Sequence, residues 1–304
     1  ADSETIRQEL VALLQDFQSR LKDHDLREKV LALVPCCQLL RSLGCSLIPK
    51  GEATSARQRI LAYLKKYPFT IIGGEELAVV SGIGEWARRV RELRVQFGWP
   101  ILSGLTAKEM AVEEEFPLKG VNVGEMKVDD YILVANVEDR EAAHRWNIAN
   151  QIRRRKGTGV REKILEFLKE NVGKPVTGEE LRYVASDKKE WARRVRELRT
   201  ENGWTVTTKQ TGRPDLPVGV YVLESLRQLP AHDRQIPDDV RVAVLERDSY
   251  SCTECGWNHG KATLSDPRHL LELHHKEHHA RGGKNTEENL VTLCNVCHDK
   301  IHRG

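Results

Sequence analysis

The sequence predicts a multidomain, mainly α-helical protein whose C-terminal part is organised by metal-binding residues. Its 304 residues are enough for two or three domains of roughly 100 to 200 residues each. The decapeptide EWARRVRELR occurs twice, at 85–94 and at 190–199. Four of the seven cysteines form two CxxC pairs near the C-terminus. The first observation predicts several domains, the second a duplication and the third a metal site.

Composition narrows the class of protein further. Hydrophobic residues make up 39% of the chain and charged residues 31%, which is typical of folded domains. The net charge of +3 is only mildly basic, so any binding to double-stranded DNA has to come from local patches. No apolar run reaches the ~18 residues of a membrane span, and no basic-then-apolar leader is present. We therefore expect a cytoplasmic protein.

Residues 1–50 predict an N-terminal helical region. Apolar residues recur at helical spacing from Ile6 to Phe17 and again from Leu26 to Ile48, which indicates two or three helices with a break at 23–25. Cys36, Cys37 and Cys45 lie in the second stretch and are expected to be packing residues.

The duplicated decapeptide belongs to a longer repeat, assigned here to residues 51–136 and 159–224. ARQRILAYLKK and GEEL precede the first copy, VREKILEFLKE and GEEL precede the second, and Gly-Trp follows both. Each copy predicts a first helix (56–67 and 159–171), a second helix starting at GEEL, and a third helix (85–97 in the first copy) that ends at glycine. Two short strands then surround a Gly/Pro-rich tip in the second copy.

This order of elements resembles the winged helix-turn-helix fold, here in tandem. In that family the third helix usually enters the DNA major groove. The resemblance makes Arg88, Arg91, Arg193 and Arg196 candidate DNA-binding residues. A solvated helix face or a protein-interaction module is the alternative. A connecting helix (137–158) ends in the basic cluster 153–156, which could follow phosphates or be a solvated linker.

The region 225–304 begins with a proline-containing linker, and eight of the eleven histidines of the chain lie between residues 259 and 302. Its cysteines, Cys252 and Cys255 with Cys294 and Cys297, form two knuckles about forty residues apart. Four thiolates so arranged suit tetrahedral zinc with no open position. The sequence therefore predicts a structural zinc site.

A second layer of this region predicts a ββα arrangement. A strand ends in His274 and His275, a Gly-Gly turn follows, and Asn289 precedes a second strand and then a helix. His298 and His302 are four residues apart on that helix, so both imidazoles can reach one cation.

The motif resembles the HNH (ββα-metal) nucleases, with a spacing similar to that of colicin DNases and McrA-like restriction endonucleases. The resemblance implies that His274, His298 and His302 bind a catalytic divalent ion. It also implies that His275 is the general base and that Asn289 fixes the loop holding this base. A second, purely structural zinc site would leave His275 and Asn289 unexplained.

Two features of the histidines do not follow directly from this resemblance. Neighbouring residues in a regular strand point to opposite faces, so His274 and His275 share one site only if the strand twists or ends there. His278 and His279 offer additional imidazoles, which could contact DNA but are expected to be exposed to solvent.

We expect a metal-dependent DNA endonuclease of restriction type, which leaves 5′-phosphate and 3′-hydroxyl ends. One such site cuts one strand, so a homodimer is expected, and DNA modification could be part of the recognition. Mg²⁺, Mn²⁺ or another divalent transition ion would serve catalysis. The alternatives are a homing or mobile-element endonuclease and a non-catalytic DNA-binding regulator.

Overall fold

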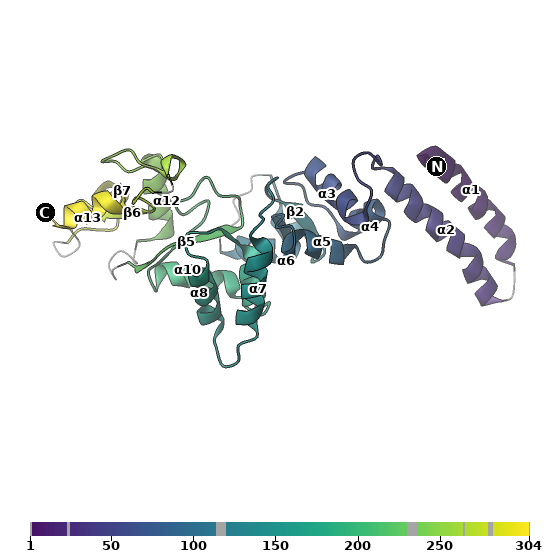
Figure 1. Cartoon of the computed structure of the whole chain (residues 1–304), viewed down its shortest axis with the longest axis horizontal. Coiled ribbons are helices and arrows are strands. Elements are labelled where there is room, and N and C mark those ends of the chain that lie inside the picture. Colours follow the sequence, from purple (N-terminus) through teal and green to yellow (C-terminus); the bar gives the residue numbers. More distant parts are fainter. Residues whose placement is uncertain are drawn as a thin grey trace. The chain divides into compact units, whose positions relative to one another are not determined.

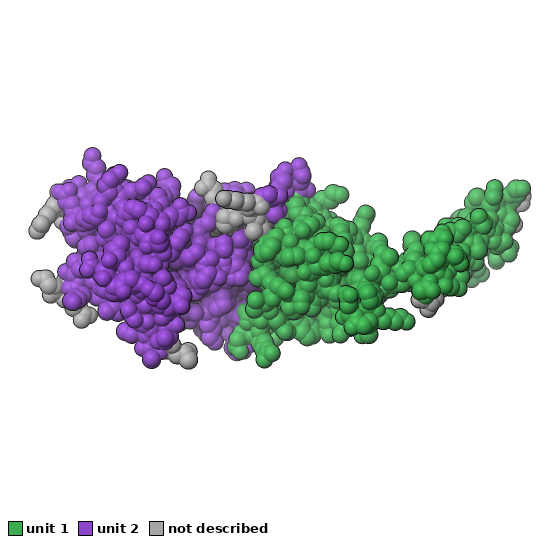
Figure 2. Space-filling view, turned by 90° about the horizontal axis from the view of Figure 1, so that it is seen from above, with its two compact units in different colours: residues 1–104, 126–143 green, residues 105–125, 144–304 purple. Residues whose placement is uncertain are grey.

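The computed structural model describes residues 2–22, 25–113, 120–229, 236–263, 265–278 and 282–303, except the side chains of His302 and Arg303. It divides into two compact units, shown in two colours in Figure 2. Unit 1 comprises residues 1–104 and 126–143, and unit 2 comprises residues 105–125 and 144–304. Within the described ranges, no helix is long and apolar enough to cross a membrane.

Unit 1 begins with a helical hairpin of α1 (Ser3–Arg20) and α2 (Leu26–Ser46), which run side by side in Figure 1. The side chains of Asp2 and Asp25 accept hydrogen bonds from backbone N–H groups of the first turns and so start the two helices. The expectation of two or three helices is therefore confirmed as two. The break expected at 23–25 includes residues 23 and 24, which lie outside the described residues.

The three cysteines of α2 differ in their environments. Cys36 is buried, and Cys45 is half-buried with its Sγ 3.4 Å from the carbonyl oxygen of Ser81. Cys37 is exposed. The expectation that all three are packing residues is therefore wrong for Cys37, because this residue lies on the outer side of the helix.

The first repeat follows in the same unit. A capping box between Ser55 and Gln58 starts its first helix. Its strands pair antiparallel, with Ile101 opposite Leu133, and cover a core that includes Leu64, Leu77 and Val90. Its elements are α3 (Ala56–Lys66), α4 (Gly74–Ser81), α5 (Trp86–Val95), β1 (Ile101–Ser103) and β2 (Tyr131–Leu133).

The second repeat, in unit 2, has the same order of elements. Thr177 and Glu180 form its capping box, and its strands form a three-stranded sheet in the order β3-β5-β4. The long strand follows the expected Gly/Pro-rich tip. Its elements are α8 (Val160–Glu170), β3 (Val176–Thr177), α9 (Gly178–Val184), α10 (Trp191–Thr200), β4 (Trp204–Thr207) and β5 (Val220–Gln228).

Two further helices pack on the second repeat. Glu109 in α6 (Gly104–Val112) accepts hydrogen bonds from Nε1 of Trp191, at 2.7 Å, and from Arg182, at 3.0 Å. The connecting helix is α7 (Ala142–Arg153), whose Arg145 forms a buried ion pair of 2.9 Å with Glu180. These contacts join both helices to the repeat through buried polar groups as well as through apolar packing.

The C-terminal part of unit 2 places a two-stranded sheet between two helices. The strands β6 (Leu271–His275) and β7 (Leu290–Cys294) pair antiparallel, with Leu271 opposite Cys294 and His275 opposite Leu290. They pack with α12 (Asp238–Arg247) and with α13 (Asn295–Arg303). The buried Trp257, which donates to Asp266 at 3.0 Å, anchors the first cysteine loop in this core. The expected ββα order is thus present.

Candidate functional site

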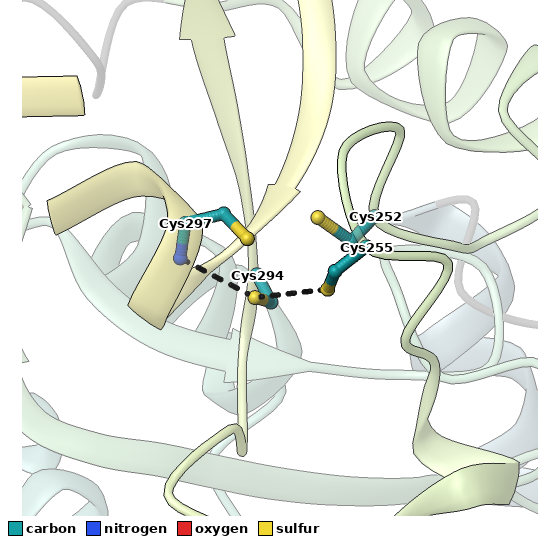
Figure 3. A group of neighbouring side chains, drawn as sticks. All are labelled: Cys252, Cys255, Cys294 and Cys297. Carbon is teal, nitrogen blue, oxygen red and sulfur yellow. Dashed lines mark hydrogen bonds between the residues drawn. The ribbon is translucent and has the colours of Figure 1, made fainter. Parts of the chain in front are cut away.

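The four cysteines expected to bind zinc come together. Their sulfur atoms all lie within 4.8 Å of one another, and the sulfurs of Cys255 and Cys294 are 3.8 Å apart. Figure 3 shows Cys252 and Cys255 on one loop, Cys294 at the end of β7 and Cys297 in the first turn of α13. Among the described residues, this is the one group of three or more potential ligands with such spacing.

The geometry of this cluster fits a tetrahedral ion. At a zinc–sulfur distance of about 2.3 Å, a tetrahedron places its sulfurs about 3.8 Å apart. Burial and the neighbouring sulfurs raise the pKa of Cys297. Burial also acts against ionisation of Cys255, but the backbone N–H of Trp257 and the three neighbouring thiols lower its pKa to about 7. A bound cation is the group that would stabilise several thiolates in so small a volume.

The two adjacent histidines lie at the end of β6, and their side chains have different contacts. The His274 ring packs edge-on against the His298 ring, with centroids 5.3 Å apart. His275 is buried, and its Nε2 lies 2.7 Å from Oδ1 of Asn285. This agrees with the alternation expected for neighbouring strand residues. The structure therefore brings His274 and His298 together, while His275 contacts the loop between the strands.

A carboxylate that the sequence analysis did not single out lies beside the histidine pair. Oε2 of Glu272 is 3.3 Å from Nδ1 of His298, and both side chains are buried. Glu272 is two residues before His274 in β6, so both lie on the same face of the strand. That alternation was the signal available in the sequence. His302 is the third histidine expected to bind the catalytic ion, and its side chain lies outside the described residues.

Asn289 closes the loop between β6 and β7. Its Oδ1 accepts from the backbone N–H of Glu277 at 2.8 Å, and its Nδ2 donates to the carbonyl oxygens of Lys284 and Glu277. Gly283 is required in the same loop, because a Cβ atom there would lie 1.8 Å from the carbonyl oxygen of Glu277. One amide side chain thus holds three points of the loop that follows His275.

Asn285 is the second residue that the sequence analysis missed. It belongs to the loop that Asn289 closes, and its side-chain oxygen is adjacent to the His275 ring. Its position in a polar loop gave no signal, because only the folded loop brings it to the ring. His278 is exposed, as expected, and His279 lies outside the described residues.

The four arginines expected to bind DNA differ in their contacts. On α5, Arg88 is 70% exposed and lies 3.6 Å from Glu92, while Arg91 is exposed and forms no ion pair with the described residues. On α10, Arg193 is bonded to Glu197 at 3.0 Å and Arg196 to Glu113 at 3.2 Å. Acidic partners therefore occupy the guanidinium groups of the second repeat more fully than those of the first.

Comparisons with known proteins match both parts of the chain. Residues 57–134 and 161–224 match the KpnI N-terminal domain family, and residues 252–304 match the HNH endonuclease family. The chain is also similar to the type IV methyl-directed restriction enzyme EcoKMcrA of Escherichia coli strain K12, with 35% identity over 63 residues. This match covers 21% of the present chain and 22% of that enzyme. No solved structure matches the chain at a significant level.

The C-terminal residues 252–304 are therefore similar to HNH endonuclease domains. The chain thus combines a segment similar to HNH endonucleases with a region similar to the KpnI N-terminal domain. The expectation of an HNH domain, drawn from residues 274–302, is confirmed.

Proposed function

We propose that this protein is a cytoplasmic restriction endonuclease that recognises double-stranded DNA through its two repeats and cuts it with the HNH domain. The arrangement of His275 beside a loop fixed by Asn289, with His274 and His298 adjacent, supports the proposal most directly. It provides a base and, beside it, candidate ligands for a cation.

In this proposal His275 takes a proton from the water that attacks the scissile phosphate. Nε2 of His275 faces the side-chain oxygen of Asn285, an acceptor, so Nε2 carries the hydrogen and Nδ1 keeps the lone pair. A neutral imidazole is a suitable base near neutral pH. Asn289 acts indirectly, because it holds the loop from which Asn285 reaches His275.

His274, His298 and His302 would hold the catalytic divalent ion, which would stabilise charge on the leaving oxygen and leave 5′-phosphate and 3′-hydroxyl ends. The carboxylate of Glu272, beside Nδ1 of His298, would orient that ring and leave its Nε2 for the ion. Mg²⁺, Mn²⁺ and other divalent transition ions are all candidates. The cysteine cluster would hold a structural Zn²⁺.

The two repeats would act as winged helix-turn-helix readers. Three helices followed by an antiparallel strand pair support this in each repeat. Arg88 and Arg91 on α5 are the more exposed pair, and Arg193 and Arg196 on α10 would first have to leave their acidic partners. The likeness to a methyl-directed enzyme makes modified DNA a substrate to test.

The test is cleavage of plasmid DNA that is unmodified or contains 5-methylcytosine or N6-methyladenine. Wild type and His275→Ala would be compared with Mg²⁺, with Mn²⁺ and with EDTA. Discrete fragments that need metal and are lost in the variant are expected, and the substrate that yields them identifies the modification preference. Retained DNA binding without cleavage of any substrate would instead favour a non-catalytic regulator.

A further inference from the structure

The hairpin of α1 and α2 has one apolar face that the repeats do not use. Oγ of Ser46 donates to Oγ of Ser3 at 2.9 Å, so the start of α1 meets the end of α2 and the two helices are antiparallel. Ile6 and Cys36 are the buried apolar residues of the seam between them. Two helices have only this seam to bury, so each keeps an outer surface exposed to water.

The apolar residues outside the seam gather on one side. The residues that lie along the seam are Ile6, Leu10, Leu13 and Phe17 on α1 and Ala32, Cys36, Leu39 and Leu43 on α2. In an antiparallel pair, positions one residue after the seam point to the same side of the pair on both helices. Those positions and their neighbours on this side include six exposed apolar residues: Val11, Leu14, Leu21, Leu26, Val30 and Leu40.

The opposite side of the hairpin is largely polar. Positions one residue before the seam include Thr5, Glu9 and Asp16 on α1, and Gln38 and Ser42 on α2. Leu31, which is 46% exposed, is an exception on this side, and Val34, which is 42% exposed, lies on the back of α2 opposite the seam. The hairpin is therefore amphipathic as a unit, which is the pattern of half of a four-helix bundle.

We propose that this face, defined as Val11, Leu14, Leu21, Leu26, Val30 and Leu40, is a dimerisation surface that pairs with the same face of a second copy of the chain. Two hairpins joined in this way would form a four-helix bundle with two-fold symmetry, in which one patch meets itself. The inference goes beyond the proposed nuclease activity, and its test does not require DNA.

The near-neutral charge of the hairpin favours a second copy of the chain as the partner of this face. The first 47 residues hold seven acidic and six basic side chains, so the hairpin is close to neutral. A surface for DNA or for an anionic membrane would carry an excess of positive charge. Two nearly neutral copies with both signs of charge do not repel each other.

The available area also suits a dimer. The 21-residue α2 is about 31 Å long, and two packed helices are about 20 Å wide, which gives a face of about 600 Å² per copy. Two copies would bury about 1,200 Å², the lower bound for a stable, specific interface. At its end the face continues into a groove lined by Leu40, Leu47 and Val79, and Val79 is itself 52% exposed.

The test is the molar mass of the 304-residue chain in solution, measured by light scattering over a range of concentrations. Wild type is expected to have twice the mass of one chain. The double variant Leu14→Glu/Leu40→Glu places charge in the face and is expected to have the mass of one chain. Leu31→Glu, the same change on the opposite side of α2, is the matched control and should leave the dimer intact.

A wild type with the mass of one chain would overturn the inference, as would equal dissociation by Leu31→Glu or an intact dimer in the double variant. Circular dichroism checks that both variants remain folded. If the wild type has the mass of one chain and binds vesicles of anionic lipid, the face is a membrane-binding surface instead. Plasmid nicking measured on the same samples separates failure of the dimer from failure of the nuclease proposal.

Discussion

Nε2 of His275 lies 2.7 Å from Oδ1 of Asn285, ten residues further along the chain. Because a side-chain amide oxygen can only accept, this contact favours the tautomer with the hydrogen on Nε2. Asn285 is not one of the residues that the sequence motif singled out. Asn285→Ala is expected to lower kcat for nicking about 10- to 100-fold with little change in KM, because the ring loses its orienting partner. Asn285→Asp keeps the acceptor and should retain more activity. Equal activity of Asn285→Ala and wild type would remove Asn285 from the proposed mechanism.

Gly283 and Gly282 provide a matched pair in the same loop. A Cβ at 283 would collide with the carbonyl oxygen of Glu277, whereas a Cβ at 282 meets nothing within 4 Å. Gly282 has a φ of +92°, so Gly282→Ala should cost about 1 kcal/mol in backbone strain. Gly283→Ala should distort the loop that Asn289 holds and reduce nicking far more strongly. The comparison is of initial nicking rates, and a larger loss in Gly282→Ala would contradict it.

The cysteine cluster should bind one zinc ion per chain. Cys255→Ser is expected to lower zinc content, measured by atomic emission, and to reduce the thermal stability of the HNH domain, because metal binding contributes to its folding. Cys37→Ser changes an exposed cysteine outside the cluster and is the control. Full zinc content in Cys255→Ser would argue against a four-thiolate site.

Removing one partner of the buried ion pair between Arg145 and Glu180 should lower the stability of the protein strongly, and a second substitution should restore it. Arg145→Met leaves a carboxylate in a buried position, and removing one partner of such a pair costs about 3–5 kcal/mol. Burial raises the pKa of Glu180, an effect that Arg145 opposes. Adding Glu180→Gln should recover most of the loss in urea unfolding. A double variant no more stable than Arg145→Met would show that the charge is not the cause.

His259 should make stability fall in acid. Burial, followed by the nearby Arg213, lowers its pKa to about 4, against an effect of Asp215 in the other direction. In the unfolded chain His259 therefore binds a proton as the pH falls below 6.5, whereas in the folded chain it binds one only near pH 4. This contribution to stability is complete above pH 6.5 and is lost as the pH falls towards 4.

The matched variant for this effect is His259→Gln, which removes the titrating ring but leaves the cysteine cluster in place. Its melting temperature should decline less steeply than that of wild type between pH 6.5 and pH 4. Parallel declines of the two proteins would assign the acid sensitivity to other groups.

The sequence by itself determined the features that repeat or that follow fixed spacings. Apolar periodicity predicted the helices, identical decapeptides predicted the duplication, and the spacing from His274 to His302 predicted the HNH domain, because each can be read from residue types and their separations along the chain. The CxxC pairs likewise predicted that Cys252 and Cys294 would meet.

Only the tertiary structure decided which groups meet across loops and elements. Asn285 reaches His275 because Asn289 folds the intervening loop, and Glu272 reaches His298 because β6 packs against α13. The contact of Arg196 with Glu113, and the sidedness of the α1–α2 hairpin, also depend on how helices pack. Such contacts join residues far apart in sequence or depend on loop conformation, so no local pattern encodes them.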